Sequence, residues 1–339
     1  MVCEEFKDKI MEATIESIGV YIPENKITNQ YFEKIIDTSD EWITSRTGIK
    51  TRYFSKENEY TSDMCIKAIE NLEKDYKKGL TDIDFIIIAT STPDQQFPSV
   101  ASKIQSRFNI PQAGCIDISA GCAGFVYGII MAQGLIATGS YKKILVAGAE
   151  TLSKICDFTD RTTCILFGDG AGAVIVEASE QKQLFSSTTV TDGSYGKELY
   201  KSEAHATING ENVINDGKIH QNGRTVFKWA VSTLPVEIRR LLEKNKLSLQ
   251  DITWMIPHSA NIRILENVCE ELGFPKEKCL QIVTDYGNTS AASIPIAWYN
   301  GIKDGKLQPG DLLVLAGFGS GLTFSGICLR NQIVNKVSK

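Results

Sequence analysis

The sequence lacks the features of several large classes of protein. It has only three histidines in 339 residues, and its nine cysteines form no Cys-x-x-Cys pair. A zinc ribbon or a disulfide framework is therefore not indicated, and we expect no bound metal. Positive charge is not in excess either, since 36 Lys and Arg stand against 41 Asp and Glu, a net charge of −5. Nucleic-acid binders are normally basic, so we expect no nucleic-acid partner.

Long hydrophobic runs are also missing. Residues 1–14 mix charged and apolar side chains and do not read as a signal peptide. The longest apolar stretch, residues 124–139, is interrupted by Gly and Gln, which favours a buried core helix over a membrane span. We therefore expect a cytoplasmic protein with no membrane partner. At 42% hydrophobic and 23% charged residues, the chain is too apolar to be disordered.

Apolar runs typical of buried strands alternate with segments of helical periodicity. The runs are residues 85–91, 143–149, 173–178, 253–258 and 311–317. Between them, Val100, Ile104 and Phe108 repeat every four residues, as do Ile264, Val268 and Leu272. This alternation predicts an α/β architecture.

The chain also repeats itself. Residues 82–92 align with residues 251–261 at an offset of 169, since Asp82 matches Asp251. Two further blocks align at an offset of 168, namely residues 122–124 with 290–292 and residues 144–149 with 312–317. Blocks in one order at nearly constant offsets predict a duplicated α/β unit. We divide the chain into an extension (1–13), an N-terminal half (14–184), a C-terminal half (185–332) and a tail (333–339), with the halves joined within the polar stretch 179–200.

Cys122 is the thiol with the most suggestive surroundings. It lies among small residues immediately before an apolar helical run. The positive end of a helix dipole favours a thiolate, and small neighbours leave room for a substrate. The alternative is a small buried hydrophobe, which we expect for the other cysteines: Cys3, Cys65, Cys115, Cys156, Cys164, Cys269, Cys279 and Cys328.

His258 and Asn288 are the polar residues most suited to act with a thiol. His258 stands between an apolar strand and a helix start, and is either an acid, a base or hydrogen-bond donor, or a satisfied core histidine. Asn288 follows a glycine and by itself reads as a turn residue. The repeat, however, places it close to the Cys122 turn. A Cys–His–Asn set could supply a nucleophile and two donors to an oxyanion.

Two glycine-rich strings needed interpretation. Residues 167–177 contain a GxGxxA spacing, but a β-rich run follows where a dinucleotide site requires a helix, so we reject NAD. Residues 317–326 follow a strand. Their backbone could aim N–H groups at a substrate oxygen, or could simply form a tight turn.

Taken together, these strings resemble the thiolase-fold condensing enzymes, and most closely the β-ketoacyl-acyl-carrier-protein synthase III family. The likeness runs from about Thr14 to Arg330 and rests on the Cys122 turn and five further motifs: DTSDEWITSRTGI (37–49), DRTTCILFGDGAGA (160–173), PHSANIRI (257–264), GNTSAAS (287–293) and GFGSGLTFSG (317–326). The resemblance implies a five-layered αβαβα fold built from two duplicated halves, and a homodimer.

It also implies an activity. An acyl-CoA primer would acylate Cys122, and malonyl-acyl-carrier protein (malonyl-ACP) would then lose CO2 and condense with the acyl group, giving a 3-oxoacyl-ACP that initiates fatty-acid synthesis. No cofactor is implied, because acyl-CoA and malonyl-ACP are substrates. A related acyl-CoA-dependent condensing enzyme, or an O- or N-acyltransferase of secondary metabolism, is the alternative. A non-catalytic acyl-binding scaffold is disfavoured because the triad is intact.

The resemblance assigns roles residue by residue. Cys122, His258 and Asn288 match the catalytic triad, and the backbone N–H groups of Cys122 and Ser320 match the oxyanion hole. The CoA-binding positions are Thr38, Trp42, Arg46, Arg161, Phe227 and Asn261. The acyl-pocket positions are Ser91, Phe97, Leu166, Phe167 and Phe318, with Phe97 reaching across the dimer. Thr162 and Ser320 stand where the family usually has Gly.

Acyl-carrier protein is acidic, so its docking site needs local positive charge. Lys228, Arg239 and Arg263 are the candidates. Lys228 and Arg239 are 11 residues apart, about three turns of one helical face, although Pro235 is expected to kink that helix. A solvated helix face is the competing interpretation of Arg239.

Overall fold

The computed structural model describes residues 10–334 of the chain. Its strands are β1 (Glu12–Tyr21), β2 (Asn25–Thr28), β3 (Thr51–Phe54), β4 (Phe85–Ala89), β5 (Gly114–Ile118), β6 (Lys143–Glu150), β7 (Gly170–Ser179), β8 (Leu184–Thr191), β9 (Leu199–Lys201), β10 (Thr207–Ile208), β11 (Glu211–Asn212), β12 (Ile219–Gln221), β13 (Trp254–Pro257), β14 (Leu312–Gly319) and β15 (Thr323–Arg330). All five apolar runs identified in the sequence lie on strands, namely β4, β6, β7, β13 and β14.

The α-helices are α1 (Asn29–Glu33), α2 (Asp40–Thr47), α3 (Thr61–Asp75), α4 (Val100–Arg107), α5 (Gly124–Ala137), α6 (Gly223–Lys244), α7 (Ile262–Leu272), α8 (Val283–Tyr286) and α9 (Ser293–Lys303). Two short 3-10 turns, η1 (Gly121–Ala123) and η6 (Ser290–Ala292), directly precede α5 and α9. The periodic segments at residues 100–108 and 264–272 form α4 and α7, as their spacing predicted.

Two sheets share one topology. The first has the order β1-β7-β6-β4-β5 and the second has the order β13-β14-β15-β8. Read from the opposite edge, the second sheet repeats the first, because β8, β15, β14 and β13 take the places of β1, β7, β6 and β4 with the same parallel and antiparallel pairings. A single parallel bridge between Met255 and Cys279 stands where β5 pairs with β4 in the first sheet.

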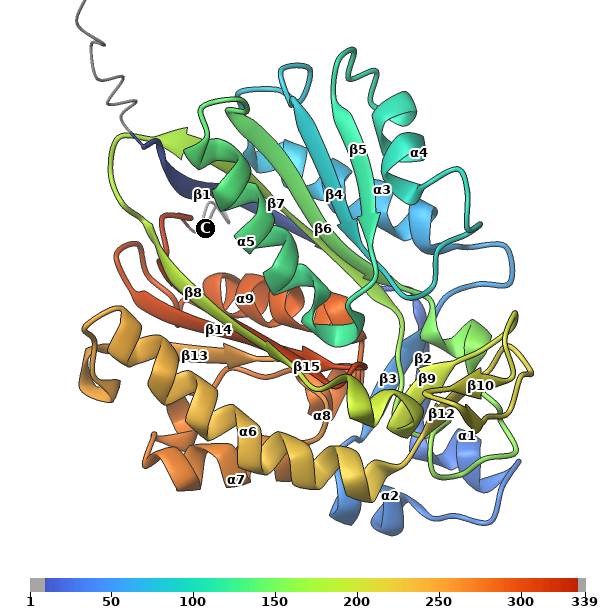
Figure 1. Cartoon of the computed structure of the whole chain (residues 1–339). Coiled ribbons are helices and arrows are strands. Elements are labelled where there is room, and N and C mark those ends of the chain that lie inside the picture. The colour runs from blue at the N-terminus through green and yellow to red at the C-terminus, as the bar shows by residue number, and fades with distance from the viewer. Residues whose placement is uncertain (1–9, 335–339) are drawn as a thin grey trace, which may run out of the picture.

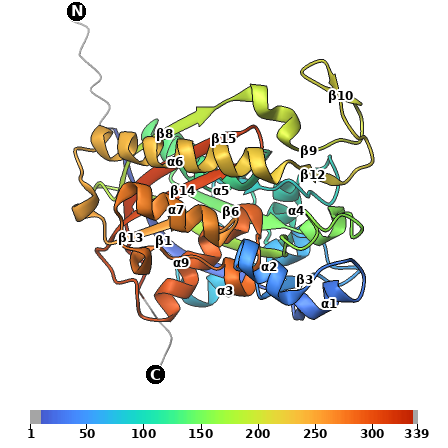
Figure 2. The same cartoon turned by 90° about the horizontal axis from the view of Figure 1, so that it is seen from below.

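The layers alternate between helix and sheet (Figure 1). Helices α3 and α4 cover the outer face of the first sheet, and α6 and α7 cover the outer face of the second, where they lie toward the viewer in Figure 2. Helices α5 and α9 fill the space between the sheets and contact strands of both. The αβαβα fold expected from the resemblance is therefore confirmed.

The middle layer explains the apolar run of residues 124–139. Helix α5 buries Phe125, Val126 and Ile129 in the core between the two sheets, so it is apolar on nearly every side. Turn η1 at its start contacts turn η6 at the start of α9. The N-termini of two duplicated helices, far apart in the sequence, thereby meet inside the molecule. Across residues 10–334, no helix is both long and apolar enough to cross a membrane.

The predicted boundaries differ from the structure in detail. Strand β1 begins at Glu12, where the sequence was assigned to an extension, because its backbone pairs with β7. Ile333, assigned to the tail, is buried in the inter-sheet core. The polar stretch 179–200 contains β8, an edge strand whose outward face tolerates polar side chains. Residues 1–9, including Cys3, and residues 335–339 lie outside the described part. The division into halves at 184/185 stays a prediction.

Candidate active site

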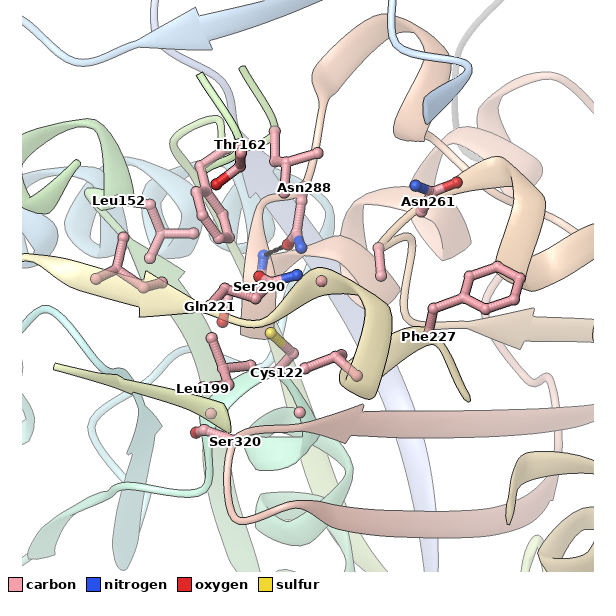
Figure 3. Close-up of a pocket in the computed structure, with 18 of the residues that line it drawn as sticks. Cys122, Leu152, Thr162, Leu199, Gln221, Phe227, Asn261, Asn288, Ser290 and Ser320 are labelled. Carbon is pink, nitrogen blue, oxygen red and sulfur yellow. Dashed lines mark hydrogen bonds between the residues drawn. The ribbon is translucent and has the colours of Figure 1, made fainter. Parts of the chain in front are cut away.

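A cavity of about 700 Å³ opens where the two halves meet (Figure 3). Its walls bring together residues from both halves, among them Cys122, Ser91, His258, Asn288 and Ser320. Ser91, His258 and Ser320 follow the carboxyl ends of β4, β13 and β14, whereas Cys122 lies within η1 and Asn288 just precedes η6. Ligands in open α/β sheets bind beyond such strand ends.

Cys122 lies within η1, two residues before the start of α5, and only 9% of it is exposed. Gly121 before it has a φ of +51°, a conformation that favours glycine. Burial raises the pKa of the Cys122 thiol to about 12, a hydrogen bond with Ser290 lowers it, and the charge of Glu150 raises it. Loss of hydration on burial therefore opposes the thiolate that the helix N-terminus favours.

His258 follows β13 and is 1% exposed. Its backbone N–H donates to Ala316 O at 2.8 Å, which continues the β13–β14 pairing, and its Nδ1 lies 2.7 Å from Ser293 Oγ. The Phe318 ring meets the imidazole edge to face, with centroids 5.1 Å apart. Burial lowers the pKa of His258 to about 3, so the ring is neutral at physiological pH.

Asn288 is held by a bridge between the halves. Its N–H donates to Leu166 O at 2.8 Å, and its carbonyl accepts from Gly168 N at 2.9 Å. Its side-chain Oδ1 accepts from Ser290 N at 2.9 Å, as the dashed line in Figure 3 marks. Because a backbone N–H can only donate, this bond fixes the amide orientation and leaves the NH2 group free to donate within the cavity.

The loop after β14 approaches the Cys122 turn through backbone atoms. A Cβ added to Gly121 would lie 3.0 Å from Ser320 N, and one added to Gly319 would lie 2.6 Å from Cys122 N. Only glycine at both positions allows this approach. The backbone nitrogens of Cys122 and Ser320 are thus brought to the same part of the cavity, an arrangement able to hold an oxyanion.

Trp42, on α2, stands at the cavity wall between two cations. The guanidinium carbons of Arg46 and Arg161 lie 5.0 and 5.1 Å from the Trp42 ring centroid. Arg161 also donates to Asp37 O at 2.8 Å. An aromatic ring flanked by guanidinium groups suits a purine and its phosphates.

The remaining predicted CoA positions separate into two groups. Phe227 and Asn261 line the cavity, as Figure 3 shows, and Asn261 caps α7 while donating to Arg46 O at 3.2 Å. Thr162 also lines it. Thr38 does not line this cavity, and its hydroxyl is buried without a hydrogen-bond partner among the described residues.

Four of the five predicted acyl-pocket residues line the cavity: Ser91, Leu166, Phe167 and Phe318. Phe97 does not, and 83% of it is exposed. In the single chain, the Phe97 side chain is thus exposed to solvent. Such exposure fits the role implied by the resemblance, in which Phe97 reaches into the acyl pocket of a second copy. Sequence reasoning missed apolar wall residues, Leu152, Ile155 and Ile165, because nothing in their local pattern distinguishes a cavity wall from a core.

The three candidate docking cations differ in their surroundings. Lys228 is exposed on α6, which continues as one helix through Pro235. Arg239 donates to Glu271 O at 2.7 Å, and Arg263 donates to Ser45 O at 2.9 and 3.1 Å. Two of the three therefore also tie neighbouring segments together, a role that the sequence did not indicate.

Other cavity residues were not anticipated. Short strands β9 and β12 pair with each other and contribute Leu199, Tyr200 and Gln221 to the wall. Ser290 also lines the cavity, and the repeat aligns it with Cys122 at an offset of 168, a signal that could have drawn attention to it. Among the described residues, no cluster of three or more His, Cys, Asp or Glu side chains could hold a metal.

Comparison with known proteins identifies the family of the chain. A model of the 3-oxoacyl-(acyl-carrier-protein) synthase III family matches residues 116–193, and the model of its C-terminal region matches residues 242–331. The chain is 48% identical to beta-ketoacyl-(acyl-carrier-protein) synthase III 2 of Halalkalibacterium halodurans, over 95% of this chain and 97% of the relative. It is also 48% identical to the Bacillus subtilis protein of the same name, over 94% and 98%.

Solved structures of synthases III also superpose closely on this chain. The 3-oxoacyl-(acyl-carrier-protein) synthase III of Aquifex aeolicus superposes with a TM-score of 0.88 at 42% identity, covering 94% of this chain and all of that one. The Thermus thermophilus synthase III superposes with a TM-score of 0.91 at 40% identity, covering 94% and 98%. With nearly complete coverage at such identity, the chain belongs to the 3-oxoacyl-(acyl-carrier-protein) synthase III family of thiolase-fold condensing enzymes.

Proposed function

We propose that this protein is an acyltransferase that condenses an acyl-CoA primer with malonyl-ACP, releasing CO2 and giving the 3-oxoacyl-ACP that starts fatty-acid synthesis. The observation that carries the proposal is the convergence of Cys122, His258 and Asn288 on one cavity at the contact between η1 and η6. Identity of 48% to synthases III over 95% of the chain supports the same reaction.

In the first half-reaction, the Cys122 sulfur attacks the thioester carbonyl of the acyl-CoA. The new C–S bond forms as the C–S bond to CoA breaks, and the thiol proton leaves with CoA as its thiol. The negative oxygen of the tetrahedral intermediate accepts from the backbone N–H groups of Cys122 and Ser320. Each such donor stabilises a developing oxyanion by about 3 kcal/mol. The N-terminus of α5 favours the charge that develops on sulfur.

In the second half-reaction, malonyl-ACP loses its carboxylate as CO2, and the electron pair of the broken C–C bond forms a thioester enolate. Neutral His258 and the NH2 group of Asn288 donate hydrogen bonds to the enolate oxygen. The enolate carbon then attacks the acyl carbonyl, a C–C bond forms, and the Cys122 thiolate leaves and is reprotonated. A neutral His258 suits this role because it needs no proton from solvent to act as a donor at pH 7.

Substrate binding follows from the walls of the cavity. The adenine of CoA stacks on Trp42 between Arg46 and Arg161, and the pantetheine arm passes Phe227 and Asn261 toward Cys122. We place Thr38 at the edge of this site. The acyl chain extends along Ser91, Leu166, Phe167 and Phe318, and Phe97 of one copy closes the pocket of the other in a homodimer.

Lys228, Arg239 and Arg263 provide the docking site for acyl-carrier protein, and Lys228, which is exposed, is the cation most available to it.

We infer a cytoplasmic location, and a chain organised as two duplicated halves of residues 14–184 and 185–332. The matching order of the two sheets supports that division.

Intact-mass spectrometry tests the proposal. The protein is incubated with a panel of acyl-CoAs and weighed, and is then supplied with malonyl-ACP. We expect an acyl adduct that is absent in Cys122→Ala, is retained in the control Cys115→Ala, and is discharged to a 3-oxoacyl-ACP. An adduct in Cys122→Ala contradicts the nucleophile. An adduct that malonyl-ACP leaves in place, but another acceptor removes, favours the acyltransferase alternative.

A further inference from the structure

Glu150, the last residue of β6, is a buried carboxylate beside the active site. None of it is exposed, and it does not line the cavity. Both carboxylate oxygens accept from Ser91 N at 3.1 Å, Oε2 accepts from Thr92 Oγ1 at 2.7 Å and Thr90 Oγ1 at 3.4 Å, and Oε1 accepts from Ser290 Oγ at 3.0 Å.

This set of partners favours the ionised form. The backbone N–H of Ser91 can only donate and lies 3.1 Å from both oxygens, and the Ser290 hydroxyl donates to Oε1, so these bonds stabilise the charged carboxylate. Burial raises the pKa of Glu150 to about 7, and these hydrogen bonds oppose that rise. A buried charge with satisfied hydrogen bonds costs less than an unpaired one, but it is still expensive to keep. Packing alone therefore gives no reason for a carboxylate here.

Ser290, which Glu150 binds, contacts every member of the triad. Its N–H donates to Asn288 Oδ1 at 2.9 Å, its carbonyl lies within hydrogen-bonding reach of the His258 ring, and its hydroxyl oxygen meets the Cys122 thiol. Its φ is +49°, a left-handed conformation that side-chain-bearing residues rarely adopt. Such a conformation persists only when surrounding contacts hold it, and the bond to Glu150 is one of them.

We propose that Glu150 is a positioning residue of the condensation reaction, which holds Ser290 in its left-handed conformation and so fixes Cys122, His258 and Asn288 relative to one another. It acts across the contact between the halves, because Glu150 ends a strand of the first sheet while Ser290 precedes α9 in the second half. The expected effect of Glu150 on condensation kinetics rests on the proposed function, whereas its effect on the arrangement of these residues does not.

A second contact extends the role to the acyl pocket. The Ser91 N–H that Glu150 binds belongs to a residue lining the cavity, at the carboxyl end of β4. One carboxylate thus links the ends of β4 and β6 to the turn that carries Ser290. Displacement of reacting groups by about 1 Å costs roughly 100-fold in rate, so losing such a link should be visible in catalysis.

The test is Glu150→Gln, which keeps the shape and removes the charge. Glu59→Gln is the matched control, since Glu59 is also buried, at 5% exposure, and binds Tyr21 and Lys67 away from the triad. We expect Glu150→Gln to lower the condensation kcat about 10- to 100-fold with little change in KM for acyl-CoA and an unchanged melting temperature. Glu59→Gln should leave both kinetic constants unchanged.

The pH profile of Cys122 alkylation by iodoacetamide gives a readout that a purely structural role would not move. The negative charge of Glu150 disfavours the thiolate, so Glu150→Gln should shift the alkylation profile to lower pH while Glu59→Gln should not. This measurement uses no acyl substrate. If wild-type protein fails to condense acyl-CoA with malonyl-ACP, the proposed function fails while the alkylation profile still tests Glu150.

A double-mutant cycle with Ser290→Ala tests the route. If Glu150 acts through Ser290, adding Glu150→Gln to Ser290→Ala should cost little further rate, so the two effects should be far from multiplicative. Multiplicative losses would show that Glu150 acts elsewhere. A folded Glu150→Gln protein with wild-type kcat and an unshifted alkylation profile would overturn the inference.

Discussion

Gly148 allows β6 and η6 to approach closely beside the candidate active site, and replacing it with alanine should push them apart. Gly148 lies near the carboxyl end of β6, and a Cβ there would stand 2.3 Å from the carbonyl oxygen of Ala291, the residue after Ser290. An ordinary carbon–oxygen contact is about 3.3 Å, so η6 would have to retreat by roughly 1 Å. The atoms that the added Cβ would meet belong to the backbone of η6, so no change of side-chain rotamer could relieve the clash.

The displacement of η6 should change both the condensation rate and the free energy of unfolding. Moving η6 by roughly 1 Å displaces Ser290 and Asn288 from Cys122, and the condensation rate should fall about 100-fold. Overpacking of this interface should also cost about 1–3 kcal/mol of unfolding free energy. Gly134→Ala is the matched control, since a Cβ there meets nothing within 4 Å on the exposed side of α5. That change should leave the rate unaltered and stabilise the protein by about 0.5–1 kcal/mol.

The assay combines steady-state condensation with urea unfolding of both variants and the wild type. Formation of the Cys122 acyl adduct, measured by intact mass, separates a damaged first half-reaction from a damaged second one. If Gly148→Ala condenses and unfolds like the wild type, the close contact between β6 and η6 does not exist in solution. If Gly134→Ala loses as much activity as Gly148→Ala, the cause is not the geometry at η6.

Three further outcomes are expected. Trp42→Ala should raise KM for acyl-CoA about tenfold or more with little effect on kcat, because stacking on a base is worth about 1–3 kcal/mol; an unchanged KM would remove Trp42 from the CoA site. The rate of alkylation of wild-type Cys122 should rise about tenfold per pH unit from pH 6 to 9 without a plateau, because burial raises the thiol pKa to about 12. A plateau near neutral pH would instead show that Cys122 is already a thiolate there, as its place at a helix N-terminus predicts. Lys228→Glu should raise KM for malonyl-ACP but not for malonyl-CoA, and equal effects on both donors would exclude a docking role.

Local patterns in the sequence carried much of the fold. The apolar runs that became β4, β6, β7, β13 and β14 needed only side-chain periodicity, because strands buried on both faces are apolar throughout. The duplication was readable because matched blocks such as those at Asp82 and Asp251 kept their order and spacing. The paired topology of the two sheets bears out that expectation of a repeated unit.

The candidate site residues were predicted from their type and from the resemblance, but their electrostatics could not be predicted in this way. Sequence placed Cys122 at a helix start and predicted a thiolate, whereas its pKa depends on how much water the folded protein removes. It offered Arg239 and Arg263 as candidate docking cations but gave no sign that each donates to a backbone carbonyl on a neighbouring segment. These hydrogen-bond partners lie on other segments of the chain, so the residues next to Arg239 and Arg263 in the sequence do not reveal them.

The sequence by itself determined the repeated α/β unit and the presence of one cysteine, one histidine and one asparagine suited to thioester chemistry. Tertiary structure decided that these residues share one cavity, and that Glu150 reaches Ser290 across the contact between the halves. The physical reason is range. Periodicity and helix starts arise from neighbours along the chain, while burial, hydrogen-bond partners and close contacts such as that at Gly148 exist only once distant segments have packed together.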